Sequence, residues 1–362
     1  MRARSIHRGA ATTAVRRNGA SVASMSEADA TGAPTVARDV GSTTPLDTGP
    51  PAAHPSISVE TVHALLASQM PHLATHPIGE RFDGWDMAMY RLGDALAVRL
   101  PRVETAVESL ARETRWTAAL SPGWSFAYPH VIQTGAPGEG YPWPWAVVTW
   151  VPGTTADASP LGAAAGAPVG RAIAEIHGPA DAGAGSSHGY ARPLVERAWF
   201  NPEQSLALTE RTAEVMWALG RVEAGDGGPD GARVDPAAAR AMWERALDAP
   251  SPADQVWSHA DLHGSNLLSD QGDFAGIIDW GKIARGDRAV DLAFLYTALP
   301  RAGVGAAVAA YREATGVDDA GLDARLLGIA LHKCLVWATL DRPLNVAMAW
   351  RGLRELGVSA PA

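Results

Sequence analysis

The sequence predicts an α+β fold of two lobes, a first lobe built on a small antiparallel β-sheet and a second that is mainly helical. Two alternating apolar runs over residues 87–100 indicate a β-hairpin, and beyond Pro152-Gly153 the apolar residues recur at helical spacing. We therefore expect a low-complexity tail over residues 1–55, the sheet lobe over 56–150 and the helical lobe over 151–362.

Bulk composition narrows the class of protein. The chain has 362 residues, enough for two lobes with a core each, and its 47% hydrophobic and 19% charged residues are typical of a globular protein. No apolar run approaches the roughly 20 residues that cross a bilayer, so we expect no membrane partner. The net charge of −9 disfavours a nucleic-acid partner, and the single Cys334 suits a reducing cytoplasm.

The tail over residues 1–55 is rich in Ala, Thr, Gly, Ser and Pro and has almost no large apolar side chains, which predicts disorder. Its first part contains no acid and five arginines: Arg2, Arg4, Arg8, Arg16 and Arg17. Two interpretations stay open, a targeting peptide and a chain that truly starts at Met25.

The sheet lobe is expected to begin with an amphipathic helix. Ser58 is a favourable N-cap, and Glu60 lies in the first turn, where the helix dipole favours an acid. Apolar residues then follow at helical spacing: Val59, Val62, Leu65 and Leu66.

The remaining elements of this lobe follow from alternation and turn chemistry. Strands over 87–92 and 95–100 flank Gly93-Asp94, a turn typical of hairpins. A helix over 104–120 comes next, and two apolar segments, 128–133 and 145–151, complete the expected sheet.

The helical lobe shows six periodic apolar segments, over 163–177, 203–219, 236–247, 288–299, 305–315 and 322–340. Only 266–269 and 274–278 have the pattern of strands in this half. Gly, Ala, Ser and Asp predominate in two expected linkers, 181–188 and 225–231.

The most informative stretch is 257–266, which reads W-S-H-A-D-L-H-G-S-N. It has the spacing H-x-D-x-x-x-x-N by which protein kinases place a base and a metal ligand on one loop. Thirteen residues after Asn266, Asp279 follows an apolar strand and precedes a glycine turn, as the metal-binding Asp of D-F-G does. The joint pattern predicts phosphoryl transfer, with Asp261 as the base and Asn266 and Asp279 as Mg²⁺ ligands.

These motifs resemble the aminoglycoside phosphotransferase family of protein-kinase-like small-molecule kinases. The family pattern is H-G-D-x-x-x-x-N, then I-D-[FW]-G, then G-D-P-A-x-D-L-A; here 278–281 reads I-D-W-G and 286–293 reads G-D-R-A-V-D-L-A. Ala260 replaces the usual glycine and Arg288 the usual proline. Neither change removes a reacting group, although alanine is strained if its position needs φ > 0. The resemblance covers about residues 57–355 and implies a two-lobed protein-kinase-like fold that holds the nucleotide between the lobes.

The resemblance also implies how the sheet lobe binds ATP or GTP. Residues 84–94 resemble the nucleotide-covering hairpin, with Met87 where many relatives have asparagine. Arg99 stands where the family places the phosphate-binding cation, and its fork can meet two phosphate oxygens. Glu113 is placed like the helix acid that pairs with this cation. Without the resemblance, Arg99 would be interpreted as a surface arginine and Glu113 as a solvated acid.

Three further assignments complete the expected site. The segment 149–153 resembles the connector between the lobes, where the backbone of Thr149 and Val151 would pair with the edge of the base. His259 is expected to support the catalytic loop through hydrogen bonds, and Asp291 to cap its helix or tie the loop.

Histidine spacing suggests one alternative chemistry. His259 and His263 are four residues apart, as are His72 and His76, which is a spacing found in zinc sites. The motif H-E-x-x-H needs glutamate where Ala260 stands, and no third ligand is evident, so we interpret these pairs as structural.

The sequence thus predicts transfer of the γ-phosphoryl group of ATP or GTP to a hydroxyl of a small molecule, an aminoglycoside-like or other antibiotic. Two rivals stay open: a metabolic kinase for choline, homoserine, a thio-sugar or a sugar amine, and a nucleotide-binding module without catalysis. Protein phosphorylation lacks support because no A-P-E follows Asp279. A cationic acceptor could meet Glu196, Glu203 or Glu210, although we favour solvated helix faces for these acids. Monomer and dimer are not distinguished.

Overall fold

The computed structural model describes residues 52–54, 56–178, 207–225, 227–252 and 254–360. The tail prediction, the linker expected at 181–188 and the candidate acids Glu196 and Glu203 therefore lie outside the described residues. The described residues belong to one unit of the chain.

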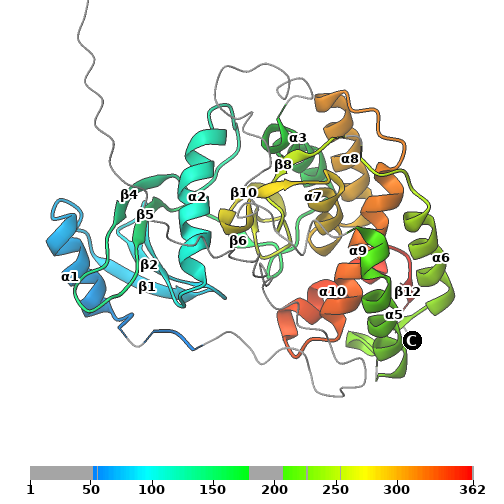
Figure 1. Ribbon diagram of the computed structural model, residues 1–362, viewed down its shortest axis with the longest axis horizontal. Coiled ribbons are helices and arrows are strands. Elements are labelled where there is room, and N and C mark those ends of the chain that lie inside the picture. Colours follow the sequence, from blue (N-terminus) through cyan, green and yellow to red (C-terminus); the bar gives the residue numbers. More distant parts are fainter. Residues whose placement is uncertain (1–51, 55, 179–206, 226, 253, 361–362) are drawn as a thin grey trace, which may run out of the picture. The chain divides into compact units, whose positions relative to one another are not determined.

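The first half of this unit is a five-stranded antiparallel sheet with two helices (Figure 1). Its strands follow the order β1-β2-β3-β5-β4. The elements are α1 (Val59–Gln69), β1 (Ile78–Asp83), β2 (Met87–Leu92), β3 (Leu96–Pro101), α2 (Ala106–Leu120), β4 (Val131–Gly135) and β5 (Trp145–Thr149).

Local signals in the sequence account for the elements that were predicted here. Ser58 caps α1, its hydroxyl accepting a hydrogen bond from the Thr61 amide at 3.2 Å. Gly93 has φ +58° in the turn between β2 and β3, a conformation that glycine adopts without strain. β1 was not predicted, because Glu80 lies between Ile78 and Phe82 on the face that would have to be apolar, so the run does not alternate cleanly.

Alternation along β3 divides its side chains between two cores. Val98 and Leu100 pack in one cluster with residues of α1, whereas Ala97 packs in another with Leu110 of α2. Because side chains two apart share a face of a strand, Arg99 points to the α2 side with Ala97. The alternation along β3 thus turns the Arg99 side chain toward α2, the helix that carries Glu113.

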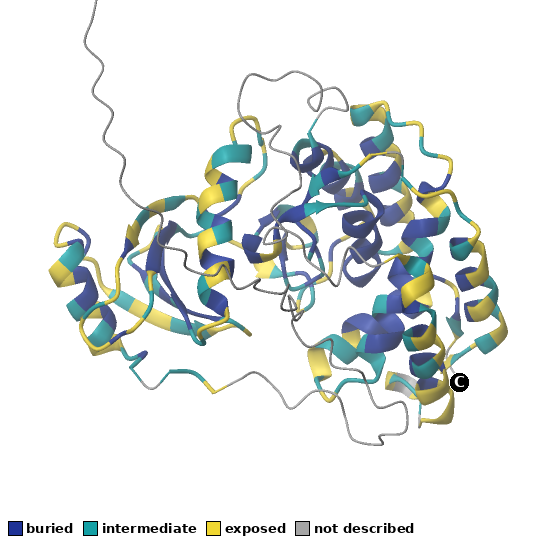
Figure 2. Cartoon of the chain, viewed as in Figure 1, coloured by how far each residue is buried: buried dark blue, intermediate teal, exposed yellow. Residues whose placement is uncertain are grey.

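The second half is mainly helical, as predicted. Its helices are α3 (Gly166–His177), α5 (Leu208–Ala224), α6 (Pro236–Leu247), α7 (Ala289–Phe294), α8 (Arg301–Thr315), α9 (Leu322–Ala338) and α10 (Pro343–Glu355). α7 is buried along its whole length (Figure 2). No helix among the described residues is both long and apolar enough to span a bilayer.

The strands β9 (Leu267–Asp270) and β10 (Asp273–Ile277) confirm the two strands predicted in this half. The expectation that no others occur was wrong. Short strands also form in it: β6 (Thr154–Thr155), β7 (Arg233–Val234), β8 (Val256–Ser258), β11 (Ala284–Gly286) and β12 (Ser359–Ala360). Strands of two or three residues are too short to display the alternation from which a strand is recognised.

Candidate active site

The loop between β8 and β9 carries Asp261 and Asn266. Hydrogen bonds to Asp291 of α7 hold this loop in place. The buried Asp291 carboxylate accepts hydrogen bonds from the backbone amides of His259 at 2.8 Å and Ala260 at 2.9 Å. His177 of α3 adds a third contact at 3.2 Å. Burial alone would raise the pKa of Asp291, but its hydrogen bond with His177 and nearby charges hold the pKa below its usual range. A carboxylate satisfied by backbone donors keeps this loop in one geometry.

Ala260 has φ +65°, in the left-handed region that glycine adopts freely. The sequence left open whether this position needs positive φ, and it does. A non-glycine residue there costs about 1 kcal/mol. The two hydrogen bonds that the Ala260 amide donates, to Ser258 Oγ at 3.1 Å and to Asp291, offset that strain.

The Asp261 carboxylate is 28% exposed, so a substrate can reach it. Its Oδ2 lies 3.7 Å from Nε2 of His263. Burial would raise the pKa of Asp261, but His263 first, then Lys333 and His259, hold the pKa well below its usual range. The carboxylate is therefore ionised at neutral pH and can accept a hydrogen bond from a hydroxyl.

Asn266 has a defined orientation. Its Nδ2 donates to the Asp261 carbonyl at 2.8 Å, so the amide oxygen points away from that carbonyl. Among the described residues, no donor bonds to Oδ1 of Asn266. This oxygen is therefore available to a cation.

Asp279 follows β10 with φ +63°, an unusual conformation for a non-glycine residue. Its side chain is 54% exposed, and Oδ1 accepts a hydrogen bond from Arg99 Nη2 at 3.2 Å. The strained turn brings a carboxylate from the helical half against a cation from the sheet.

Arg99 and Glu113 form a buried ion pair between β3 and α2, through Nη1 and Oε1. Burial raises the pKa of Glu113 to about 7, although the Arg99 charge opposes the rise. The pKa of Arg99 is raised in spite of burial, because Glu113 and Asp279 both lie beside it. The structure thus brings together Arg99, Glu113 and Asp279, residues separated by up to 180 positions.

The turn after Asp279 is docked on α2. Arg112 Nη1 donates to the Gly281 carbonyl at 2.8 Å. A Cβ on Gly281 would lie 3.1 Å from Cβ of Ser109, which is tighter than ordinary contact, so glycine allows this close approach. The helix that carries Glu113 is therefore tied directly to the segment that carries Asp279.

His259 is fully buried beneath the loop. Its Nε2 is 3.0 Å from the Ile278 carbonyl and therefore carries the proton, and the ring packs edge-on against Trp280 at 4.6 Å. Burial lowers the pKa of His259, so the neutral form persists. This side chain links the loop of Asp261 to the segment of Asp279.

The connector presents its two predicted residues differently. The Thr149 amide donates to the His130 carbonyl at 2.9 Å, and its hydroxyl accepts from the His130 amide at 2.8 Å. Val151 is buried and forms no hydrogen bond with another described residue. Both backbone groups of Val151 are thus available to a base edge, whereas the amide of Thr149 is already engaged in the sheet.

Two titratable residues near the site were not assigned a role from the sequence. Asp86, in the β1–β2 turn, has its pKa raised by burial, with Asp279 and Asp261 adding to the rise and Lys282 opposing it. His263, interpreted as part of a structural pair, lies beside Asp261. The position of Asp86 depends on segments far away in the chain, for which the sequence carries no local signal, whereas His263 is only two residues from Asp261.

Arg288, the second departure from the family pattern, is buried in a network of charges. It pairs with Asp254 and donates to the Tyr311 hydroxyl at 3.4 Å. That hydroxyl lies 2.8 Å from Nδ1 of His177, which in turn contacts Asp291. The arginine therefore supports the loop through its side chain, where the family has a proline.

Glu210, the one candidate substrate acid within the described residues, is exposed at the start of α5. Its Oε2 accepts a hydrogen bond from the Ala207 amide at 2.7 Å. It serves as a helix cap, which agrees with the solvated interpretation.

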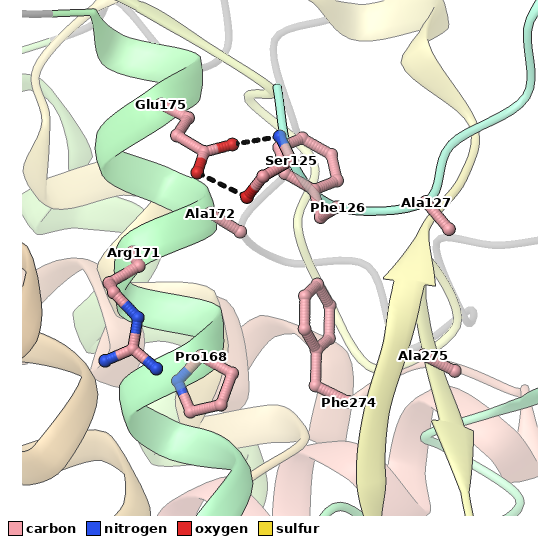
Figure 3. A pocket seen from close by; sticks show the side chains of 9 residues that line it. All are labelled: Ser125, Phe126, Ala127, Pro168, Arg171, Ala172, Glu175, Phe274 and Ala275. Atoms are coloured by element: carbon pink, nitrogen blue, oxygen red, sulfur yellow. Dashed lines mark hydrogen bonds between the residues drawn. The ribbon is translucent and has the colours of Figure 1, made fainter. Parts of the chain in front are cut away.

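A pocket of about 400 Å³ lies away from these groups, between α3, β10 and the segment before β4 (Figure 3). Phe126 and Phe274 line it together with Arg171 and Glu175, and Glu175 is held by two hydrogen bonds of 2.6 Å from Ser125. None of the residues predicted for the site lines this pocket.

The free oxygens fit a magnesium ion bound together with a nucleotide. Mg²⁺ usually binds through one or two protein oxygens plus phosphate oxygens and water. Asn266 Oδ1 is unengaged, and Asp279 offers Oδ2 beside the oxygen bonded to Arg99. Within the described ranges, no group of three or more His, Cys, Asp or Glu side chains is arranged as a metal site.

Comparison with solved structures reveals the same fold in antibiotic phosphotransferases. The GDP complex of aminoglycoside 2′-phosphotransferase-IIIa is 15% identical with a TM-score of 0.54, over 82% of this chain and 97% of that chain. Macrolide 2′-phosphotransferase type I is 18% identical with a TM-score of 0.50, over 83% and 98%. A macrolide 2′-phosphotransferase from Brachybacterium faecium is 22% identical with a TM-score of 0.48, over 77% and 98%.

Among curated proteins, no sequence matches. The profile of the phosphotransferase enzyme family, by contrast, matches residues 79–326, from β1 to the first turns of α9. This span contains the β1–β2 turn, the Arg99–Glu113 pair, residues 149–153 and the loop that carries Asp261. The chain belongs to the phosphotransferase enzyme family.

Proposed function

We propose that this protein transfers the γ-phosphoryl group of ATP or GTP to a hydroxyl of a small molecule, an antibiotic of the aminoglycoside or macrolide kind. The observation that carries the proposal is the convergence of Asp261, Asn266 and Asp279 with the buried Arg99–Glu113 pair. A structure of the related aminoglycoside 2′-phosphotransferase holds both GDP and kanamycin, which supports a nucleotide and a hydroxyl-bearing acceptor in this fold.

In this proposal Asp261 orients the acceptor hydroxyl and takes its proton as the oxygen bonds to the γ-phosphorus, while the bond from the γ-phosphorus to the β-phosphate oxygen breaks and ADP or GDP leaves. The ionised state of Asp261 suits that role, because an acceptor-only carboxylate binds the hydroxyl hydrogen. Asn266 and Asp279 would hold Mg²⁺, which would neutralise phosphate charge. Arg99 contacts the α- and β-phosphates with Glu113 fixing its guanidinium, and Val151 and Thr149 lie along the base. Positioning and electrostatics supply most of the rate in such a reaction.

His259 and Asp291 act as supports in the same scheme. Neither is exposed: Asp291 accepts hydrogen bonds from the backbone before Asp261, and the His259 side chain donates to the Ile278 carbonyl next to Asp279. Their role is to keep Asp261 and Asn266 at a fixed separation from Asp279.

The test is a phosphorylation screen of the purified protein with ATP and GTP separately, Mg²⁺ and a panel of aminoglycosides, macrolides and metabolic alcohols. We expect Mg²⁺-dependent phosphorylation of at least one antibiotic. Transfer to choline, homoserine or a sugar amine alone would favour the metabolic kinase, and nucleotide binding without transfer to any acceptor would favour the binding module.

A further inference from the structure

Trp85 is a large apolar side chain at the tip of the β1–β2 hairpin, and it is 42% exposed. One face of its ring is nevertheless covered. The guanidinium carbon of Arg342 lies 3.4 Å from the ring centroid, which is the distance of a direct stack. Arg342 immediately precedes α10, so this contact joins the sheet half to the helical half across more than 250 residues of chain.

The hairpin end of the contact is rigid. The Gly84 amide donates to the Met87 carbonyl at 2.8 Å, and Arg102 holds the turn by donating to the carbonyls of Gly84 at 2.6 Å and Asp86 at 2.8 Å. Asp86, next to Trp85, is within electrostatic range of both Asp279 and Asp261. The tip therefore lies close to the groups proposed to handle the phosphates.

α10 is also held in place, through Arg351 on backbone carbonyls outside the loop of Asp261 and through Met348 on the loop itself. Arg351 Nη1 donates to the carbonyls of Thr297 at 3.0 Å and Ala156 at 3.2 Å. Met348 Sδ lies 3.9 Å from the Ser265 hydroxyl, within the loop that carries Asp261. A displacement of α10 would therefore also shift the loop that carries Asp261.

We propose that the stack of Trp85 on Arg342 is a clasp that sets the distance between the nucleotide-covering hairpin and the catalytic loop, so that both are positioning residues for phosphoryl transfer. Each end is held by hydrogen bonds within its own half, and the clasp joins the two. It opens when nucleotide enters or leaves and closes for the transfer, as lids do in many enzymes. The catalytic role of the clasp rests on the proposed function, whereas its existence as an interlobe contact does not.

The first test measures hydrogen exchange on the full chain without ligand. Loss of one partner should loosen the segment that carries the other. Arg342→Ala should speed exchange in the peptide over residues 83–92, and Trp85→Ala in the peptide over 339–346, each by about two- to fivefold, as expected for a partly exposed cation–π contact. In the double variant, exchange should speed up no more than it does in the single variant with the larger increase.

Arg91→Ala is the matched control. Arg91 stacks on Trp150 with its guanidinium carbon 4.2 Å from the ring centroid, entirely within the sheet half. Its loss should leave exchange over 339–346 unchanged. Unchanged exchange at the distant partner in both clasp variants would overturn the clasp, whatever activity the protein has.

The second test measures the dissociation rates of mant-ADP and mant-GDP in the presence of Mg²⁺. Trp85→Ala and Arg342→Ala should each speed release by about two- to fivefold, with Trp85→Phe close to wild type because it keeps a ring under the guanidinium. Release at the wild-type rate in both alanine variants would overturn the role in the reaction cycle. If the wild type binds neither nucleotide, the proposed function is wrong. The contact of Trp85 with Arg342 between the lobes is still confirmed in that case if the exchange rates change as expected.

Discussion

The catalytic loop and the Arg99 cluster are built in opposite ways. Around Asp261, the support comes from backbone amides and from histidine side chains that bond to Asp291 and Ile278. Around Arg99, it comes from charged side chains on three separate elements. The loop therefore has a geometry that ordinary pH leaves intact, whereas the cluster depends on the charge of Glu113, whose pKa is about 7. The half of the site around Asp261 is therefore preorganised, whereas the half around Arg99 changes with the protonation of Glu113.

The largest expected effect is on the loop side. Asp261→Ala should lower turnover by about 10²–10⁴-fold and leave nucleotide affinity largely intact, because Asp261 faces the acceptor hydroxyl while the nucleotide contacts lie elsewhere. Steady-state rates and nucleotide binding by calorimetry measure the two quantities. A purified variant that keeps more than about a tenth of the wild-type rate would contradict the role of Asp261.

Asp291→Asn tests the support beneath the loop. An amide in place of the carboxylate turns an NH₂ group toward donors, so at least one of the amides of His259 and Ala260 loses its partner. We expect a loss of about 2–4 kcal/mol in the free energy of unfolding and a fall in kcat, since a buried donor is left unsatisfied. Urea denaturation measures the first quantity. Wild-type stability would show that the loop is held by other contacts.

Glu113 should make the stability of the cluster depend on pH. Burial raises its pKa from the ordinary value of 4.5 to about 7, so the folded protein binds this proton more tightly than the unfolded chain between those values. The contribution of Glu113 to the free energy of unfolding is therefore present below pH 4.5 and is lost as the pH rises through 7, by about 1–3 kcal/mol.

Glu113→Gln isolates this contribution, because glutamine does not titrate. Urea denaturation gives the free energy of unfolding of both proteins at pH 5 and at pH 8. This free energy should fall less between the two pH values in the variant than in the wild type. If the free energy of unfolding changes equally with pH in the two proteins, Glu113 is already ionised at pH 5. The Arg99 cluster would then be as insensitive to pH as the loop that carries Asp261.

The smallest effect concerns the strain in the loop. Ala260→Gly should raise the free energy of unfolding by about 1 kcal/mol, because φ is +65° at this position. Ala241→Gly in the interior of α6 is the control, and it should lower stability by about 1 kcal/mol instead. Loss of stability in both variants would show that the left-handed conformation is not strained here. Turnover should stay close to wild type in each.

Elements with local signals could be predicted from the sequence. α6 begins at Pro236 as expected, because Asp235 caps it with hydrogen bonds of 2.9 and 3.0 Å to the next amides. The geometry of Asn266 also follows from spacing, since its amide bonds to a carbonyl only five residues earlier. Sequence patterns capture such contacts because the chain returns to itself within a few residues.

Contacts between distant segments could not be predicted in the same way. α10 was missed, although Pro343 starts it, because its buried face is defined by packing against α9, the short 3₁₀ turn Leu295–Thr297 and β12, all of them distant or separate elements. The partners of Arg288 and the stack of Trp85 on Arg342 depend on residues far away in the chain. The resemblance to the family supplied Arg99 and Glu113, which composition and spacing alone would have assigned to the surface.

The measurement that tests the central claim most directly is metal binding in the presence of a non-hydrolysable nucleotide, with Mn²⁺ in place of Mg²⁺ and electron paramagnetic resonance as the readout. The claim is that Asn266 and Asp279 hold the metal while Asp261 serves the acceptor. We predict that Asp279→Asn abolishes the bound Mn²⁺ signal, that Asn266→Ala weakens binding about tenfold or more, and that Asp261→Asn leaves it close to wild type. Wild-type Mn²⁺ affinity in both Asp279→Asn and Asn266→Ala would contradict the account.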